Sequence, residues 1–98
     1  MDIAMHIIIM KFGPAKSQAP QHMEGHKAWL DEGVASGVFH CVGSLDVGGG
    51  FILAHGEQTE ALKERVAADP FVQHNVVVVE MHHVDVNRTS PELGFLKA

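Results

Sequence analysis

The short sequence Asp69-Pro70-Phe71 constrains the fold of this chain more than any other feature. A helical pattern precedes it and an apolar run follows it, so the chain must change direction here. Proline disfavours the helical conformation in the residue before it, and Asp69 should therefore lie where the helix ends. Phe71 begins the apolar run, which needs a hydrophobic core to enter. We therefore expect a carboxylate at a corner between two buried elements.

The rest of the chain alternates between patterns typical of strands and of helices. Runs of β-branched and aromatic residues predict strands, and apolar residues at steps of three and four predict helices. In chain order we expect a strand at 4–12, a helix from 21 to a terminating Gly37, strands at 38–47 and 51–55, a helix at 59–68 with Thr59 as its cap, and a strand at 71–86. Glycines 48–50 can supply the positive φ of a turn between the two middle strands. This order predicts an α+β domain with the ferredoxin-like βαββαβ arrangement, in which both helices cover one face of an antiparallel sheet.

The first and last strands carry apolar side chains on both faces, which predicts that the sheet is covered on both sides. Leaving several Val or Ile side chains in water would forgo about 1.5–3 kcal/mol for each. We therefore expect a second copy of the chain to cover the face without helices and form a homodimer. We also expect Leu93, Phe95 and Leu96 of the tail to pack on this partner.

The bulk composition narrows the class of protein. A chain of 98 residues makes one domain, here with a core at about 4–86 and a tail at 87–98. The net charge is -5 and the 7 basic residues are scattered singly, which argues against nucleic acid as a partner. The N-terminal apolar run is too short to span a membrane, and a single cysteine suits a reducing compartment. We expect a soluble cytoplasmic protein with no membrane partner.

His26 is the first candidate for chemistry, because it shares the inward stripe of the first helix with Leu30. Histidine titrates closest to neutral pH, so it can take and return protons during a reaction. If Asp69 lies within hydrogen-bond reach, its carboxylate would fix the tautomer of the imidazole. This pair would suit eliminations and isomerisations beside a carbonyl group. The other interpretation is a core histidine that is tied to a helix-end aspartate for stability.

Other residues offer weaker alternatives. His22 and His26 are four positions apart on one helix face, a spacing that can chelate a metal ion. No third ligand is placed by the sequence, although candidates exist: His40, His55, His74 and Glu80. We expect no native metal and no cofactor. Cys41 alternates with Phe39 and Gly43, which indicates a packed apolar face and an inert thiol.

Several segments resemble the YciI-like (YCII-related) family over residues 5–84. They are His26-Lys27-Ala28-Trp29-Leu30, Gly43-Ser44, Thr59-Glu60-Ala61 and Asp69-Pro70-Phe71-Val72. The resemblance implies a dimeric α+β barrel in which His26 and Asp69 line a cleft as a catalytic pair. Related enzymes dehydrochlorinate a chlorinated hydroxyquinol, and the wider superfamily includes lactone isomerases and monooxygenases that are cofactor-free or use haem. The chain differs from this family where it has Ser44 in place of proline and His74-Asn75 in place of a common glycine.

Together these observations predict a small-molecule enzyme of lyase or isomerase type. His26 would act as general acid and base and Asp69 would orient it, on a small cyclic or carbonyl-bearing substrate. We expect four further residues to contact the substrate: Ser44, Phe71, His40 and His74. Two alternatives stay open, a non-catalytic ligand-binding or accessory dimer and a purely structural dimer.

Overall fold

The computed structural model describes residues 5–97 of the chain. Its elements in chain order are β1 (Met5–Phe12), η1 (Lys16–Gln18), α1 (Ala19–Ala35), β2 (Phe39–Ser44), β3 (Gly50–His55), α2 (Thr59–Ala67), α3 (Pro70–Gln73), β4 (Val77–Val84) and η2 (Pro91–Lys97). The two η elements are 3-10 helices. Within the described residues, no helix combines the length and the apolar character that crossing a membrane requires.

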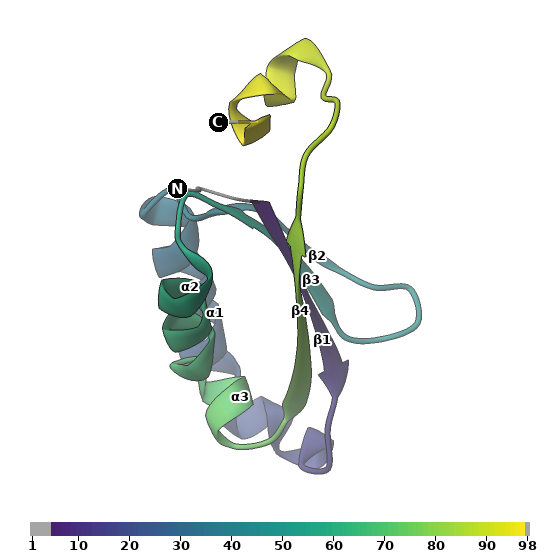
Figure 1. Ribbon diagram of the computed structural model, residues 1–98. Helices are drawn as coiled ribbons and strands as arrows, with labels where there is room; N and C mark the ends of the chain where they lie inside the picture. The colour runs from purple at the N-terminus through teal and green to yellow at the C-terminus, as the bar shows by residue number, and fades with distance from the viewer. Residues whose placement is uncertain (1–4, 98) are drawn as a thin grey trace.

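Four strands form one antiparallel sheet in the order β2-β3-β1-β4. The helices α1, α2 and α3 lie side by side on one face of this sheet (Figure 1). Alternate residues of β1 point toward the helices, and Ile8 and Met10 on that face are almost fully buried. This is the ferredoxin-like α+β arrangement that the sequence predicts.

Glycines at two places allow close contacts that a side chain would block. Gly33 of α1 lies under the ring of Phe39, where a Cβ atom would come within 2.1 Å of the ring. Gly37 ends α1 with φ 83°, and its N–H donates to the carbonyl of Val34 while the Val38 N–H donates to the carbonyl of Gly33. These two hydrogen bonds satisfy the last carbonyls of the helix, as the predicted terminating glycine requires.

The boundaries near the Asp69 corner differ from the prediction. The chain forms the short helix α3 (Pro70–Gln73) where a strand was expected from residue 71, and β4 begins at Val77. The reason is that Asp69 accepts a hydrogen bond from the Phe71 N–H and proline occupies the first helical turn, which together start a helix. Asn75 then turns the chain toward β4 with φ 60°.

Two predictions about the helices are also wrong. Gln58 occupies the N-cap position of α2 without a capping hydrogen bond from its side chain, and the Thr59 hydroxyl instead forms a hydrogen bond of 2.9 Å with Nε2 of the buried His6. The first helix begins at Ala19 rather than at 21, because Pro20 fits the first turn of a helix.

The prediction that Cys41 lies on a packed apolar face is wrong as well. Phe39 pairs with Ala54, but Cys41 pairs with Leu53, so the register between β2 and β3 shifts by one residue at His40. Such a bulge sends the following side chains to the opposite face. Phe39 is therefore buried under the helices, and Cys41 is exposed on the other face.

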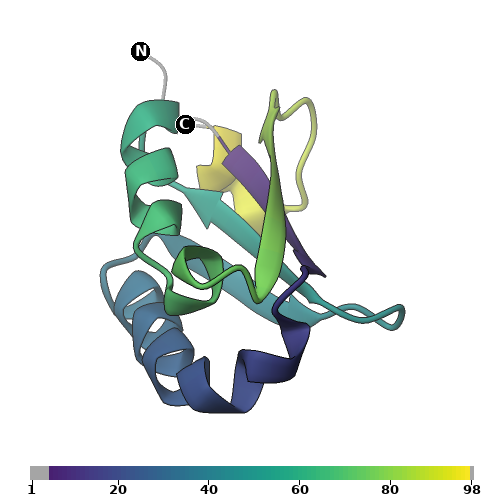
Figure 2. The same ribbon diagram turned by 90° about the horizontal axis from the view of Figure 1, so that it is seen from below.

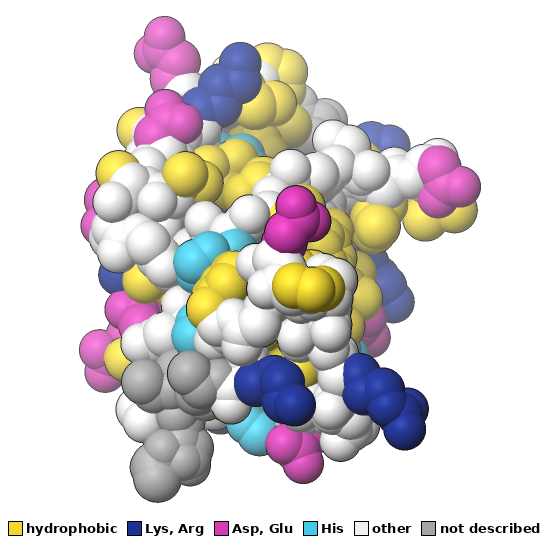
Figure 3. All heavy atoms as spheres, turned by 90° about the horizontal axis from the view of Figure 1, so that it is seen from above, with side chains coloured by type: hydrophobic (Ala, Val, Ile, Leu, Met, Phe, Trp, Pro, Cys, Tyr) yellow, Lys and Arg dark blue, Asp and Glu magenta, His cyan; other side chains and the backbone are white. Residues whose placement is uncertain are grey.

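The tail folds onto its own chain. Leu96 of η2 is buried, and the ring of Phe95 lies 4.8 Å from the ring of His40 and 5.6 Å from that of His55. Leu96 therefore packs within its own chain rather than on a partner, whereas Leu93 and Phe95 are 46% and 42% exposed, and the expectation that they pack on a partner stays a prediction. Figure 3 looks down on this end of the molecule, where acidic and basic side chains are scattered among hydrophobic ones.

The turn between β2 and β3 extends beyond the sheet (Figure 2) and is made by glycines, as predicted. Gly49 has φ 93°, and a Cβ atom there would lie 2.1 Å from the Met10 carbonyl oxygen. Gly43, at the end of β2, has free space around the same position and no positive φ.

We therefore expect Gly49→Ala to lower the free energy of unfolding by at least about 1–3 kcal/mol, because it adds a backbone clash to an unfavourable φ. Gly43→Ala is the matched control and should change it by less than about 0.5 kcal/mol. Urea denaturation followed by circular dichroism measures both values. Equal stability of the two variants would contradict the assigned role of Gly49.

Candidate functional site

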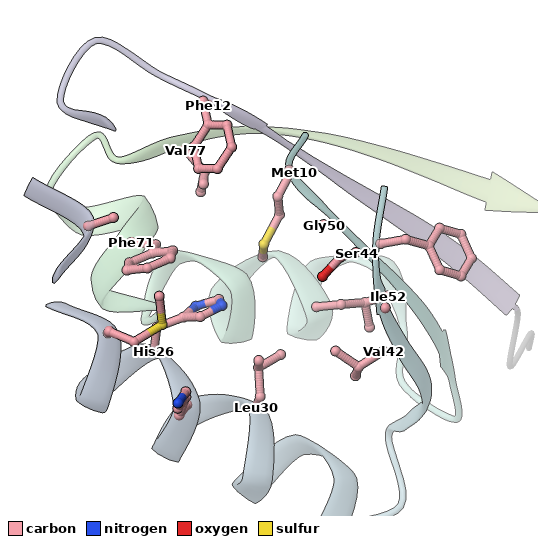
Figure 4. A pocket seen from close by; sticks show the side chains of 16 residues that line it. Met10, Phe12, His26, Leu30, Val42, Ser44, Gly50, Ile52, Phe71 and Val77 are labelled. Atoms are coloured by element: carbon pink, nitrogen blue, oxygen red, sulfur yellow. The ribbon is translucent and has the colours of Figure 1, made fainter. Parts of the chain in front are cut away.

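A pocket of about 410 Å³ opens between the sheet and the helices α1 and α3 (Figure 4). Its lining residues are Met10, Phe12, Ala19, Met23, His26, Lys27, Leu30, Val42, Gly43, Ser44, Gly49, Gly50, Phe51, Ile52, Phe71 and Val77. Most of these side chains are apolar, which is typical of sites that take small organic molecules. His26 faces the pocket from α1, and Ser44 and Ile52 face it from the sheet.

His26 and Asp69 meet at one side of this pocket, as the sequence predicts. Nδ1 of His26 lies 2.9 Å from Oδ1 of Asp69, a distance typical of a charge-assisted hydrogen bond. The side chain of Asp69 is fully buried, whereas that of His26 is 13% exposed. The carboxylate can only accept, so Nδ1 carries the proton, and Nε2 of a neutral ring is left as the basic nitrogen.

Asp69 holds two elements at once. Its Oδ1 also accepts a hydrogen bond of 3.0 Å from the Phe71 N–H, which caps α3. The other oxygen, Oδ2, is buried and has no hydrogen-bond partner among the described residues. Both hydrogen bonds to the carboxylate therefore fall on one oxygen, and His26 supplies one of the two donors.

The plane of the His26 ring is fixed by stacking. The ring of Phe71 lies parallel to it at a centroid distance of 4.0 Å and an angle of 4° (Figure 4). Gly25 lets α1 come close enough for this contact, because a Cβ atom there would already lie 3.0 Å from Pro70 Cγ. The stacked ring and the hydrogen bond at Nδ1 together leave His26 little freedom to rotate.

A second set of contacts ties α1 to α2 behind the pocket. The indole N–H of Trp29 donates to the Arg65 carbonyl at 2.8 Å. The Arg65 guanidinium binds both oxygens of Glu57 and also reaches Glu32 of α1. The paired Glu57 carboxylate raises the pKa of Arg65 above its usual value, and burial opposes this only in part. These bonds fix the end of α2 from which Asp69 projects.

The other predicted site residues divide into two groups. Ser44 and Phe71 line the pocket, whereas His40 and His74 do not. The β2 bulge leaves His40 beside His55 and Phe95, away from the pocket. His74 follows α3 and stacks on His22 of α1 at 4.0 Å, because the chain forms a helix where a strand was predicted.

Sequence reasoning did not single out Lys27, Val42 or Ile52 as pocket residues. Lys27 adjoins His26 in sequence, which is the one signal that could have found it. Val42 could not be found from alternation, since the bulge reverses which residues of β2 face the helices. Its partner Ile52 lies on the buried face of β3.

The histidine pair His22 and His26 does not form a metal site with other residues. Between residues 5 and 97, no group of three or more His, Cys, Asp or Glu side chains is placed to hold a metal ion. Instead, Asp69 occupies Nδ1 of His26, and His22 stacks on His74.

We expect the two bonds of Asp69 to be separable by substitution. Asp69→Ser keeps an oxygen that can cap α3 but is too short to reach His26, whereas Asp69→Ala loses both bonds. Asp69→Ala should lower the free energy of unfolding by about 2–4 kcal/mol, and Asp69→Ser by about 1 kcal/mol less. Urea titration of both variants measures the difference, and identical losses would show that the cap contributes nothing.

Comparison with solved structures finds a similar fold in an enzyme. The chain is similar to 5-chloro-2-hydroxyhydroquinone dehydrochlorinase (TftG) from Burkholderia phenoliruptrix AC1100, solved in complex with 2,5-dihydroxybenzoquinone. The TM-score is 0.64 at 20% sequence identity, over 78% of this chain and 90% of that one. This likeness shows a shared fold. No curated protein sequence matches the chain.

The family comparison covers most of the sequence. Residues 4–84 match the YCII-related domain, and this range includes every strand, the helices α1 to α3 and the residues that line the pocket. The tail with η2 lies outside the matched range. On this match, the chain belongs to the family of YCII-related domains.

Proposed function

We propose that this protein is a small-molecule enzyme in which His26 transfers a proton and Asp69 orients and stabilises it. The observation that carries the proposal is the 2.9 Å hydrogen bond between the two side chains at the edge of an apolar pocket. A fixed imidazole with its second nitrogen available is suited to general acid–base catalysis. The low polarity of the pocket strengthens each electrostatic interaction inside it.

The chemistry follows from this arrangement. Nε2 of His26 accepts a proton from a hydroxyl group, or from a carbon atom beside a carbonyl, and becomes an imidazolium that faces the Asp69 carboxylate. The electron pair of the broken bond forms a new π bond in the substrate. In an elimination this expels a leaving group as an anion, and in an isomerisation the imidazolium returns the proton to another atom. Both reactions need only the one acid–base pair.

The substrate class is a small cyclic or carbonyl-bearing compound. A pocket of about 410 Å³ with a largely apolar lining suits a single ring better than an extended or highly charged molecule. The fold relative from Burkholderia phenoliruptrix AC1100 is a dehydrochlorinase of a hydroxylated ring and binds a quinone. Its chemistry is an elimination, which supports the proposed type of reaction for this chain.

The first test measures proton transfer directly. The protein is incubated in D₂O with small cyclic ketones and with 5-chloro-2-hydroxyhydroquinone, and deuterium incorporation and chloride release are followed by NMR and by a chloride electrode. We expect His26→Asn to lose at least about 100-fold in rate, because the amide can still donate to Asp69 but cannot accept and return a proton. Asp69→Asn should lose at least about tenfold, since the ring loses its orienting charge.

Circular dichroism and thermal melting establish that both variants are folded before their rates are compared. His83→Asn is the control, because His83 lies on β4 and does not line the pocket. Wild-type rates in folded His26→Asn would refute the catalytic role of the histidine.

The alternative is a non-catalytic ligand-binding module that uses the same pocket. It is favoured by the described lining residues, among which His26 carries the one imidazole and none carries a carboxylate that could transfer a second proton. A thermal-shift screen finds compounds that raise the melting temperature. A compound that binds and is recovered chemically unchanged would favour this alternative.

We also propose that the protein is a homodimer that pairs sheet to sheet. The helices α1 to α3 cover one face, and half-buried apolar residues of β1 and β3 lie on the other: Ile7, Ile9, Phe51 and Leu53. Leaving this face in water would forgo the hydrophobic free energy that a second copy supplies.

Sedimentation velocity at micromolar concentration should show a dimer. Leu53→Glu should shift it toward monomer, because the charge would be buried in the proposed interface. Val34→Glu is the matched control, since Val34 is 54% exposed on α1. A monodisperse wild-type monomer would contradict the proposed assembly.

A further inference from the structure

The polar groups of the pocket are few and have one sign of charge. Among residues 5–97, His26, Lys27 and Ser44 are the lining residues with polar side chains, and none of these described residues lines the pocket with a carboxylate. Lys27 is exposed and lies next to His26 on α1, so it stands at the mouth rather than in the interior. A ligand entering this pocket therefore meets one lysine ammonium group and, from the described lining residues, no carboxylate.

Lys27 is also unpaired within the described part of the chain. Lys11 and Lys63 form ion pairs with Glu80 and Glu60 at 3.4 and 3.6 Å. Glu24 and Asp31 lie three residues before and four residues after Lys27, within reach on a helix, yet neither forms an ion pair with it. Its ammonium group is thus available to a ligand.

We infer that Lys27 selects ligands that carry a negative charge, so that the pocket takes a planar ring with an acidic group. The chain has a net charge of -5, and its overall field would repel such an anion unless a local cation attracts it. This inference rests on the pocket of the proposed function and names the class of its substrate.

The placement of Lys27 gives the ligand a definite orientation. The acidic group stays at the mouth beside the exposed Lys27, where water still hydrates the charge and the desolvation cost is small. The ring enters the apolar interior between Leu30 on α1 and Val42 and Ile52 on the sheet, with its edge toward His26. The acidic group that binds Lys27 and the atom that exchanges a proton with His26 then lie on different parts of the same ring.

The acidic group has two chemical sources, a carboxylate and an ionised ring hydroxyl. Both present an oxygen anion to an ammonium group. The test therefore uses two pairs of probes of similar shape and different charge: benzoate against benzamide, and 4-nitrophenolate against nitrobenzene at pH 8.5.

Binding is measured by isothermal titration calorimetry on the full-length wild-type protein and three variants. We expect at least one anion to bind the wild type about fivefold more tightly than its neutral partner, with the preference weakening as salt is raised. Lys27→Met should remove this preference and Lys27→Arg should keep it. Lys63→Met is the matched control, because it removes the same charge from α2, outside the pocket lining, and should leave the preference unchanged.

Equal binding of each anion and its neutral partner to the wild type, or no binding of any probe, would overturn the inference. So would an unchanged preference in Lys27→Met. The pair that shows the preference identifies the source as a carboxylate or a hydroxyl. Because the readout is binding, its failure is distinct from a failure of the His26→Asn turnover test.

Discussion

Asp69 is fully buried, and its oxygen Oδ1 accepts hydrogen bonds from two elements at once, the imidazole of His26 on α1 and the backbone N–H of Phe71 at the start of α3. A buried carboxylate is costly unless donors surround it. The helices α1 and α3 therefore cannot separate without removing one of the two hydrogen-bond donors to that buried carboxylate. The carboxylate that caps α3 at the corner of the fold is also the one that orients the histidine.

The side chain of His26 is held by these contacts but is not enclosed by them. An imidazole that only served the core would be turned inward with both nitrogens satisfied, but His26 lines the pocket and keeps part of its ring exposed. Phe71 stacks on the ring, and Gly25 allows α1 to approach Pro70. Fold stability and ring orientation thus come from the same few contacts, which is how a small domain can hold an imidazole in one orientation.

The sequence predicted the sheet, the helices and the positions of His26 and Asp69 on them because each depends on local periodicity or on the restriction that proline imposes. That the two side chains form a pair was implied by the resemblance to the YCII-related family. It did not predict the β2 bulge, because a one-residue register shift depends on the pairing of β2 with β3 and leaves no periodic signal. That single shift exposed Cys41 and kept His40 out of the pocket. The short helix α3 was missed because an apolar run of valines after Phe71 favours a strand.

Two glycines of the β2–β3 turn, Gly49 and Gly50, line the pocket and leave it room because they have no side chain. Gly49 is required by its backbone, since both its φ and the nearby Met10 carbonyl exclude a side chain. Gly50 is different, because a Cβ atom there would lie at an ordinary 3.5 Å from the Gly43 carbonyl oxygen and its φ is not positive. It pairs with Met10 and Ser44, which also line the pocket. A side chain there would take volume from the pocket without straining the chain, so the missing side chain of Gly50 keeps this part of the pocket open.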